Sequence, residues 1–423
     1  MKGKNLMQKF IRTPLKISYV LLICFFLLNP IKAQAQLVMG QYEDEAPFRT
    51  WNVFGLLTGA SLSMGAAHYA HSFDLSAALT NPSQLSQLPQ YTAVINGSLS
   101  RAAFFKYSIV NTGPVHKENN SSLMLPSLDF GGLSMRLKDW NFALSTSILE
   151  NYARPSISFE GYTNNYPVEF EQNGLLRNIN FALSRNLGKH VSIGLAINYV
   201  TGNISKKIEE EYFGGAVIIS DNKSHNLQGF YFNGGVTVRI TSRLQAAAVF
   251  RTPYEKISDS ESFLRYKSMI TETDIIISSR EASTFKQPWI LGAGINYNFS
   301  EKFRAAVDTT FFNWASYKVT LFGEARPRDF KNILTIGGGF EYMCRPQVSG
   351  PLLNIPIWLG FHYDPQPMKN PDSHYFYITF GTGLVLDDFF INAGAALGFE
   401  NGSESPLDGQ RIEITIGYRS EKK

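Results

Sequence analysis

Apolar and polar residues alternate one by one in many short stretches of this chain. From Val191 to Tyr199 every second residue is apolar, while Ser192, Gly194 and Asn198 occupy positions between them. Two further stretches with this alternation are residues 289–299 and 411–419. Successive side chains of a β-strand point to opposite faces. Each stretch therefore predicts a strand with one apolar face and one small or polar face.

The polar faces of these strands distinguish two all-β architectures. In a soluble sandwich the apolar faces pack together and the polar faces meet bulk water, where charged residues are common. Here the polar faces hold mainly Gly, Ala, Ser, Asn and Thr, and only 17% of all residues are charged. A confined polar interior with apolar faces turned toward lipid fits this composition better. A transmembrane barrel is predicted, with a soluble all-β domain as the alternative.

The turns between the predicted strands support the barrel. We place strands at residues 91–109, 122–137, 140–150, 175–187, 190–203, 225–240, 243–254, 285–299, 302–317, 330–343, 355–363, 373–386, 388–400 and 408–419. Tight connections such as Lys138-Asp139 and Gly188-Lys189 alternate with long ones such as 204–224 and 255–284. Short periplasmic turns, long outer loops and an even strand number are typical of outer-membrane barrels. The prediction is an antiparallel barrel of about fourteen strands at residues 91–423.

The first residues have the pattern of a secretory signal. A basic start with Lys2, Lys4 and Lys9 precedes a short apolar run, and small residues end it at Ala35. Residues 1–35 are therefore expected to be a cleaved signal peptide rather than a membrane anchor. The segment at residues 36–90 has few charges near its end, is rich in Gly, Ala and Ser, and lacks strand alternation. We expect it to lie in the barrel lumen as a hatch, because enclosed segments need small residues and satisfied polar groups.

Glycines on the predicted inner faces leave two explanations open. They occur in pairs at Gly292 and Gly294, Gly337 and Gly339, Gly381 and Gly383, and Gly394 and Gly398. A backbone or ligand that approaches the strand closely is one reason for a strand glycine. Easier curvature of the barrel is the other.

Overall charge and cysteine content exclude some classes of function. The formal net charge is +4, with Lys and Arg scattered, so no nucleic-acid-binding surface is indicated. Cys344 is the only cysteine beyond the predicted signal, so an internal disulfide is not expected in that part.

Three stretches resemble the FadL-like family of outer-membrane transporters for long-chain fatty acids. The sequence Asn81-Pro82-Ser83 is similar to the Asn-Pro-Ala signature of the family's hatch. Residues 287–318 resemble a family hairpin, with Asp308, Asn313 and Trp314 in place and Ala315 where Ser is usual, and residues 329–342 resemble the following strand. The resemblance implies a fourteen-stranded barrel whose N-terminal hatch, at Asn81, Pro82 and Ser83, gates passage.

The resemblance also implies a first binding groove on the third and fourth outer loops. The apolar candidates there are Tyr212, Phe213, Phe263, Leu264 and Tyr266. The alternative is that these segments are strands that continue above the membrane. For a ligand carboxylate, Arg251 on an inward phase is the candidate, with Arg265 and Lys267 above it.

Catalytic and metal-binding patterns are not found. His68 and His71 have only Asp74 nearby, so a polar hatch contact is favoured over a metal site. No nucleophile elbow or phosphate-binding loop occurs, and His362 beside Trp358 has no identified Ser partner. We therefore expect a non-enzymatic protein without cofactors.

The sequence hypothesis is a multi-pass protein of the Gram-negative outer membrane. It would take up long-chain fatty acids or other hydrophobic small molecules passively, in contact with outer-membrane lipid. The alternative is a non-transporting accessory barrel that docks partner proteins in a secretion or assembly complex, although no motif indicates such a partner.

Overall fold

The structure is a computed structural model that describes residues 53–104, 121–160, 167–326, 328–346, 353–369, 372–402 and 409–420. Its helices are short: α3 (Gly59–Ser63) and the 3₁₀ helices η1 (Leu75–Ala78), η2 (Pro82–Gln87) and η3 (Trp314–Ser316). The strands are β1 (Tyr91–Phe104), β2 (Ser121–Leu137), β3 (Trp140–Asn151), β4 (Arg154–Glu160), β5 (Pro167–Leu187), β6 (Val191–Tyr212), β7 (Val217–Arg239), β8 (Leu244–Arg251), β9 (Tyr254–Ser268), β10 (Thr273–Gln287), β11 (Ile290–Asn298), β12 (Phe303–Phe312), β13 (Lys318–Leu321), β14 (Glu324–Arg326), β15 (Ile333–Cys344), β16 (Leu353–Pro365), β17 (His374–Leu386), β18 (Phe389–Asn401) and β19 (Gly409–Ser420). The predicted signal peptide lies outside the described residues.

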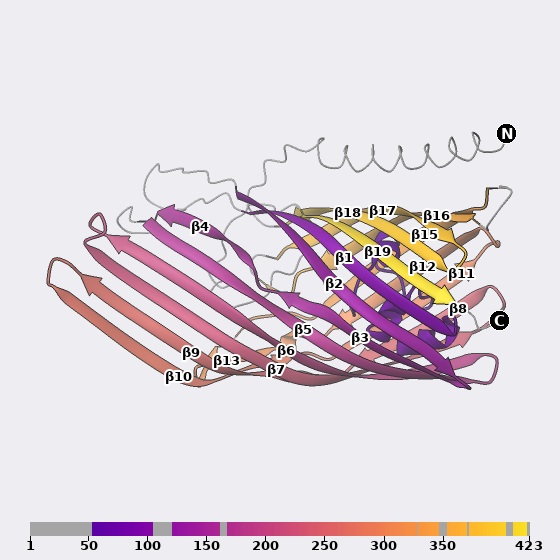
Figure 1. Cartoon of the computed structure of the whole chain (residues 1–423), viewed down its shortest axis with the longest axis horizontal. Coiled ribbons are helices and arrows are strands. Elements are labelled where there is room, and N and C mark those ends of the chain that lie inside the picture. The colour runs from indigo at the N-terminus through magenta and orange to yellow at the C-terminus, as the bar shows by residue number, and fades with distance from the viewer. Residues whose placement is uncertain are drawn as a thin grey trace.

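These strands form one antiparallel sheet that closes on itself (Figure 1). The first strand, β1, pairs with the last, β19, from Tyr91 opposite Ser420 to Ala102 opposite Gly409. Two barrel strands are interrupted, β8 with β9 at Thr252-Pro253 and β10 with β11 at Pro288-Trp289. With each interrupted pair taken as one, fourteen described strands make the wall, apart from the short β4, β13 and β14. The predicted fold class is confirmed.

Apolar side chains of the wall point outward and small or polar ones point inward. On β6, Leu195 is 68% exposed, whereas its neighbours Gly194 and Ala196 are buried. Such an exposed apolar surface is stable only in contact with lipid, because each strand turns its apolar face away from the lumen. The molecule is therefore a transmembrane barrel of the outer-membrane type, and the soluble alternative is wrong. Among the described residues, no helix combines the length and apolar character needed to cross a membrane.

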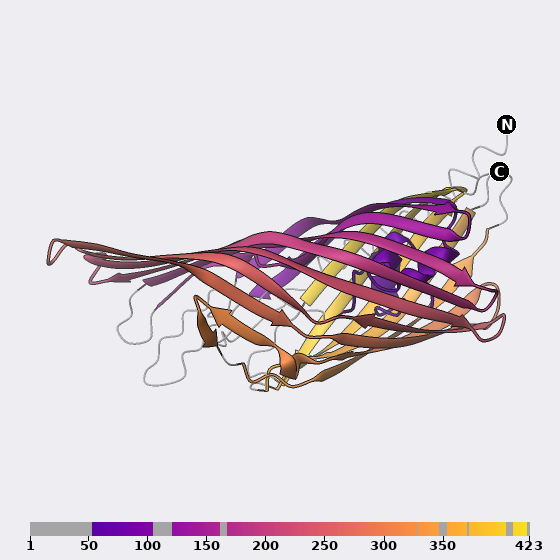
Figure 2. The ribbon, with the colours of Figure 1, turned by 90° about the horizontal axis from the view of Figure 1, so that it is seen from below.

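The two ends of the barrel differ (Figure 2). One end carries the tight turns, such as those at Lys138-Asp139 and Asp387-Asp388. At the other end, long hairpins project well past the rest of the wall (Figures 1 and 2). Segments 204–224 and 255–284, predicted as loops, are mostly strand, so the alternative of strands continuing above the membrane is correct.

The projecting part is a curved sheet of six strands that we call the extension. It consists of β4 and the outer portions of β5, β6, β7, β9 and β10, beyond the pair formed by Gln228 and Ile257. Bonding runs in that order, because β7 pairs with β9 along residues 217–228. The extension therefore continues the barrel wall on one side only.

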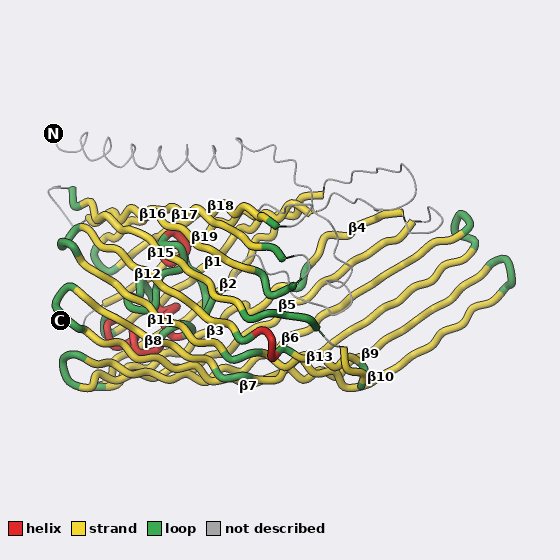
Figure 3. The backbone as a smooth tube through the Cα atoms, turned by 180° about the vertical axis from the view of Figure 1, so that it is seen from behind, coloured by secondary structure: helices red, strands yellow, loops and turns green. Residues whose placement is uncertain are grey.

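Residues 53–90 lie inside the barrel at the end with the tight turns (Figures 2 and 3). We keep the name hatch for this described part of the predicted segment 36–90. Its three short helices are almost entirely buried, and its apolar side chains Leu75, Leu79 and Leu85 pack on inward-facing residues of the wall. The hatch therefore fills the lumen at the tight-turn end, while the exact domain boundaries stay a prediction.

Candidate functional site

Asn81 joins the hatch to the barrel wall. Its side chain is 0% exposed and caps η2, where Oδ1 accepts from the Ser83 backbone N–H at 3.2 Å and from the Ser83 hydroxyl at 2.7 Å. Its Nδ2 donates to the Tyr69 carbonyl at 2.7 Å and to Thr237 Oγ1 on β7 at 3.0 Å. Pro82 follows as the first residue of η2, where a missing N–H costs no helical bond. The Asn81-Pro82-Ser83 motif thus fixes both the local turn and its place on the wall.

Asp308 on β12 binds the hatch at His68 and Tyr69. Its Oδ2 accepts from the backbone N–H groups of His68 at 2.6 Å and Tyr69 at 2.8 Å. The Tyr69 hydroxyl lies 2.7 Å from Thr310 Oγ1 on the same strand. Since all four residues are buried, these bonds form in a low-dielectric setting in which an unpaired group would be costly.

Several inward glycines lie where the hatch backbone approaches the wall. A Cβ at Gly337 would stand 1.9 Å from the Gly65 carbonyl oxygen, and one at Gly394 would stand 2.1 Å from the Gly59 carbonyl oxygen. Any side chain there would displace the hatch. A Cβ at Gly398 would instead meet the ring of Tyr377 on the neighbouring strand. Close approach of the hatch therefore explains the first two glycines but not all of them.

A polar network connects the hatch with the last strand of the barrel. The Gly59 backbone N–H donates to Thr415 Oγ1 at 2.8 Å, and that hydroxyl donates to Asn96 Oδ1 at 2.6 Å. Asn96 Nδ2 donates to Glu413 Oε2 at 2.6 Å, and Glu413 in turn is paired with Arg411. The start of the hatch is therefore tied to the seam between β1 and β19.

An apolar cluster lines the lumen on the outer side of the hatch. We call it the lumen cluster; its buried members are Tyr152, Leu176, Val200, Ile204, Leu227, Tyr231, Tyr254, Phe285, Val319 and Leu321. Tyr152 lies between β3 and β4, and the others come from the inward faces of β5, β6, β7, β9 and β10 and from the hairpin that carries β13. Apolar side chains toward the interior break the polar-inside pattern of an aqueous channel. The lumen at this level is suited to hydrophobic material.

Two cations lie beside the lumen cluster. Lys256 is buried, and its Nζ contacts Glu150 Oε2 at 2.6 Å and the Tyr152 hydroxyl at 3.0 Å. The Arg251 guanidinium lies 5.6 Å from the ring centres of both Tyr231 and Tyr254, and its buried Nε has no hydrogen-bond partner. Arg251 therefore presents a charge in the lumen, on the inward phase that the sequence predicts.

The predicted groove residues are not all brought together. Leu264 and Tyr266 share the inner face of the extension, because they follow inward Lys256 at intervals of two residues. Tyr212 lies on that face near the tip, since its partner Val217 pairs with inward Ser268. Phe263 and Phe213 do not join them.

Phe263 and Phe213 therefore do not lie on the inner face of the extension, and Arg251 lies far from it along the wall. Phe263 belongs to the outer face, and Phe213 stands in the β6–β7 turn with a positive φ of 51° and 78% exposure. Arg251 is about 40 Å along the wall from Leu264, at about 3.3 Å per residue. The structure thus separates a lumen site from the extension surface.

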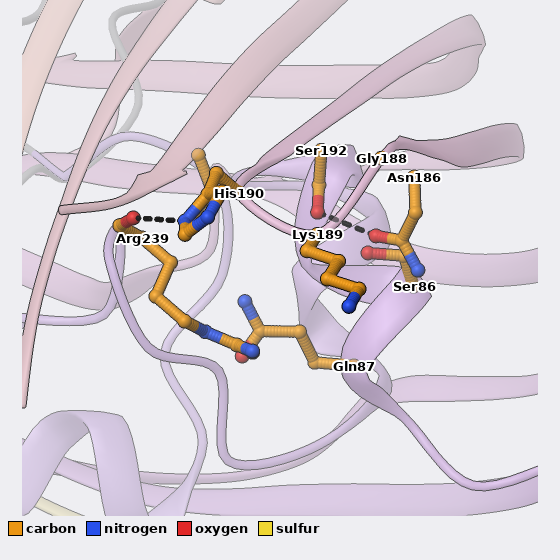
Figure 4. Close-up of a pocket in the computed structure, with 9 residues that line it drawn as sticks. Ser86, Gln87, Asn186, Gly188, Lys189, His190, Ser192 and Arg239 are labelled. Atoms are coloured by element: carbon orange, nitrogen blue, oxygen red, sulfur yellow. Dashed lines mark hydrogen bonds between the residues drawn. The ribbon is translucent and has the colours of Figure 1, made fainter. Parts of the chain in front are cut away.

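A polar pocket opens at the tight-turn end, between the hatch and the turn after β5 (Figure 4). It has a volume of about 510 Å³ and is lined by Ser86, Gln87, Asn186, Gly188, Lys189, His190, Ser192, Thr237 and Arg239. Two of these residues are permanent cations and none is acidic. Thr237 also bonds Asn81, so the hatch contact with β7 borders this pocket.

The histidines weighed as metal ligands have other surroundings. His71 Nε2 contacts Arg304 Nη1, and Arg304 also forms an ion pair with Glu341. His68 stacks at a tilt on Tyr69, with 5.4 Å between ring centres. In the part of the chain that the structure describes, no three His, Cys, Asp or Glu side chains are arranged to hold a metal ion.

The sequence reasoning missed two features of the lumen. The motif that contains Asp308 does not indicate its bond to the hatch backbone. The sequence also does not indicate the ion pair of Glu150 and Lys256, although Lys256 lies two residues after inward Tyr254 and so on an inward phase. A charged residue at a lumen-facing position is the sequence signal that indicates such an ion pair.

The closed barrel, the buried hatch and the lined lumen define a transmembrane β-barrel with an internal N-terminal plug. A sequence profile of the family described as BamG matches residues 57–413, which is most of the chain. The protein therefore belongs to the BamG family. A search among curated proteins found no match.

Solved structures with the same fold include channels of the FadL-like type that the sequence motifs resemble. The chain is similar to the CymD monoaromatic hydrocarbon channel, with a TM-score of 0.64 and 14% identity over 88% of this chain and 100% of that one. It is also similar to the Ralstonia pickettii toluene transporter TbuX, with a TM-score of 0.60 and 14% identity over 88% of this chain and 100% of that one. The Pseudomonas putida toluene transporter TodX matches with a TM-score of 0.61 and 14% identity over 87% of this chain and 99% of that one. At such low identity the likeness establishes the fold.

Proposed function

We propose that the protein passes small hydrophobic molecules through its lumen across the outer membrane of a Gram-negative cell. The lumen cluster is the observation that carries the proposal, because an apolar lining has no use in a water-filled pore. The fold shared with hydrocarbon channels and toluene transporters supports it. Passage would be passive, driven by the concentration difference.

Long-chain fatty acids are the ligands we propose within this class. Their tails would lie on the lumen cluster, and Arg251 would receive the carboxylate through its unpartnered Nε. Leu264, Tyr266 and Tyr212 would offer an apolar landing surface at the outer end. Phe213, in the exposed β6–β7 turn, and Phe263, on the opposite face of the sheet, would not line this surface.

The hatch is proposed to gate the inner exit. Asn81, Pro82 and Ser83 hold it against Thr237 beside the polar pocket, so an exit there needs these bonds to rearrange. A ligand would leave either past this contact or sideways through the wall.

A displacement assay tests the lumen site and the fatty acid separately. Purified protein in mild detergent would be loaded with the fluorescent fatty acid cis-parinaric acid, which is then displaced by oleate or by toluene. For Arg251→Gln we expect oleate to bind about tenfold more weakly, the effect of one charge-assisted hydrogen bond, with toluene binding unchanged. The matched control is Arg243→Gln, in an exposed turn.

The outcomes separate the finer proposal from the coarser one. Equal oleate affinity in both variants would remove the fatty-acid assignment and leave hydrophobic transport standing. If neither oleate nor toluene displaces the probe at any concentration up to its solubility, transport is wrong.

An accessory role in a protein complex is the second candidate. The extension favours it, because its strands project past the rest of the wall, and residues 263–267 of β9 and 274–282 of β10 are exposed there. Transport assays in which the protein is inactive alone and no amphiphile co-purifies would favour this role.

A further inference from the structure

The last strand of the extension, β10, has one unpaired edge. Along Thr273–Glu281 it pairs with β9 on one side, and no described residue pairs with it on the other (Figures 1 and 2). β13 reaches only Thr284–Lys286, at the base of the extension. Nine residues of strand edge are thus left open.

The backbone groups on that edge can be assigned from one bond. The Ala282 carbonyl accepts from the Gly323 N–H at 3.2 Å, on the side away from β9. In an antiparallel strand the N–H and C=O of one residue point to the same side, and successive residues alternate. Asp274, Ile276, Ser278 and Arg280 therefore present their N–H and C=O groups to the open side.

This edge lacks two features that commonly protect exposed strands. Ile275, Ile276 and Ile277 are consecutive and 49%, 64% and 60% exposed. The open stretch contains no Lys and no Pro, the residues that commonly prevent pairing at an edge. Such a strand readily accepts another one.

Two of the three charged residues of the open stretch, Asp274 and Arg280, form ion pairs within the extension. Asp274 is held by Arg265 on β9 at 2.7 Å. Arg280 contacts Asp259 and lies 3.3 Å from Glu261, both on β9. Arg280 is shared by two carboxylates and Glu281 follows it, so the edge is acidic at its base, while isoleucines and serines occupy its centre.

We propose that the open edge of β10 binds an extended segment of a different protein, which adds one more strand to the extension. Backbone bonds at Asp274, Ile276, Ser278 and Arg280 would supply affinity, and apolar side chains next to Ile275, Ile276 and Ile277 would supply specificity. The segment that fits is uncharged at its centre and apolar on both faces there. The proposal is independent of whether the lumen passes a ligand.

Symmetry argues against a second copy of this chain as the occupant. An antiparallel pair of two β10 edges would turn one barrel upside down in the membrane. Two upright copies would meet in parallel, and their two-fold axis would set each edge N–H opposite the same N–H. A parallel ladder instead needs N–H groups opposite carbonyls, staggered along the strand, so a symmetric dimer forms no ladder.

Photo-crosslinking in intact cells tests the proposal. A benzoylphenylalanine probe placed at Ile276 should give one product, and mass spectrometry should assign it to a single segment of another protein. The same probe at exposed Lys207 on β6, away from the edge, is the control. We expect at least tenfold more product at Ile276.

A second substitution distinguishes strand addition from simple proximity. Ser278→Pro removes an N–H from the open edge and leaves the β9 ladder intact, whereas Ser278→Ala keeps that N–H. With the Ile276 probe, we expect about tenfold less product for Ser278→Pro and no change for Ser278→Ala. Heat-modifiable mobility in gels reports whether each barrel is folded.

Three results would overturn the proposal for a folded barrel. They are equal yields at Ile276 and Lys207, a product that contains only lipid or a second copy of this chain, and a yield indifferent to Ser278→Pro.

Discussion

The two ends of β7 show how differently one strand can be used. At its inner end, Thr237 is buried and bonds three hatch side chains, those of Asn81, Ser83 and Gln84. At its outer end, near Ile219, the strand belongs to the extension, which lies at the opposite end of the molecule from the hatch. The inner half is constrained by what it encloses, whereas the extension is held by its ladder and side-chain pairs alone. Substitutions matched between the two regions should therefore differ in cost.

The largest contrast is expected for leucine truncation. Leu176→Ala removes a side chain that is 0% exposed in the lumen cluster and should cost about 2–5 kcal/mol of unfolding free energy. Leu264→Ala, at a partly exposed site of the extension, should cost less than about 1 kcal/mol. Urea unfolding from lipid vesicles measures both. Equal costs would mean that the lumen cluster is loosely packed.

Added methyl groups should separate the hatch contact from an open strand position. Gly337→Ala forces the hatch backbone away and should cost about 1–3 kcal/mol of unfolding free energy. At Gly131 nothing lies within 4 Å of an added Cβ, so Gly131→Ala should change that free energy by less than about 0.5 kcal/mol. Limited proteolysis of the hatch gives a second readout. A hatch that resists proteolysis equally in both variants would contradict a close contact between the hatch and Gly337.

Asparagine truncation should follow the same order with a smaller difference. Asn81→Ala removes the η2 cap and two bonds to buried acceptors, and should lower the unfolding free energy by about 2 kcal/mol. Asn222 in the extension makes one bond, to Ser220 at 3.2 Å, and Asn222→Ala should stay within about 0.5 kcal/mol. The urea midpoint measures the difference, and its absence would argue against Asn81 as an anchor.

The smallest effects concern the ion pairs of the extension. Arg280 holds the pKa of Asp259 below its ordinary value of 3.8 by donating hydrogen bonds to it, and Arg265 does the same for Asp274. A depressed carboxyl pKa contributes stability above the ordinary value and loses it as pH falls through the lowered pKa. These pairs should therefore weaken only below about pH 4.

Carboxyl-carbon NMR of the two aspartates tests this. Arg280→Ala should raise the pKa of Asp259 toward 3.8 and leave that of Asp274 unchanged, and Arg265→Ala should do the reverse. An equal response of both aspartates to one substitution would mean that the pairs act as a single network.

Sequence reasoning succeeds where the membrane imposes a rule. On β6, lipid outside and a narrow lumen inside require alternation from Ile193 to Asn198, so the strand and its orientation are readable. In the extension, the consecutive residues Ile275, Ile276 and Ile277 are all exposed, so apolar and polar residues do not alternate there. The pattern that identifies a spanning strand is therefore missing from the extension, although β10 is regular strand.

The candidate site divides in the same way. Arg251 was placed on the inward side because its position follows from the phase of one strand. The pair of Lys256 and Glu150 joins residues 106 positions apart, and the Asp308 bonds to His68 span 240. Such contacts depend on barrel closure and on the fit of the hatch, which no local pattern encodes.

The seam between β1 and β19 has a consequence for biogenesis. Its register joins Tyr91 to Ser420, so the cylinder stays open until nearly the whole chain has been made. The Gly59 N–H also needs Thr415 of the final strand. This hatch contact can therefore form only once the last strand is in place, and a chain shortened at its C-terminus would lose both the closure and the bond that holds Gly59.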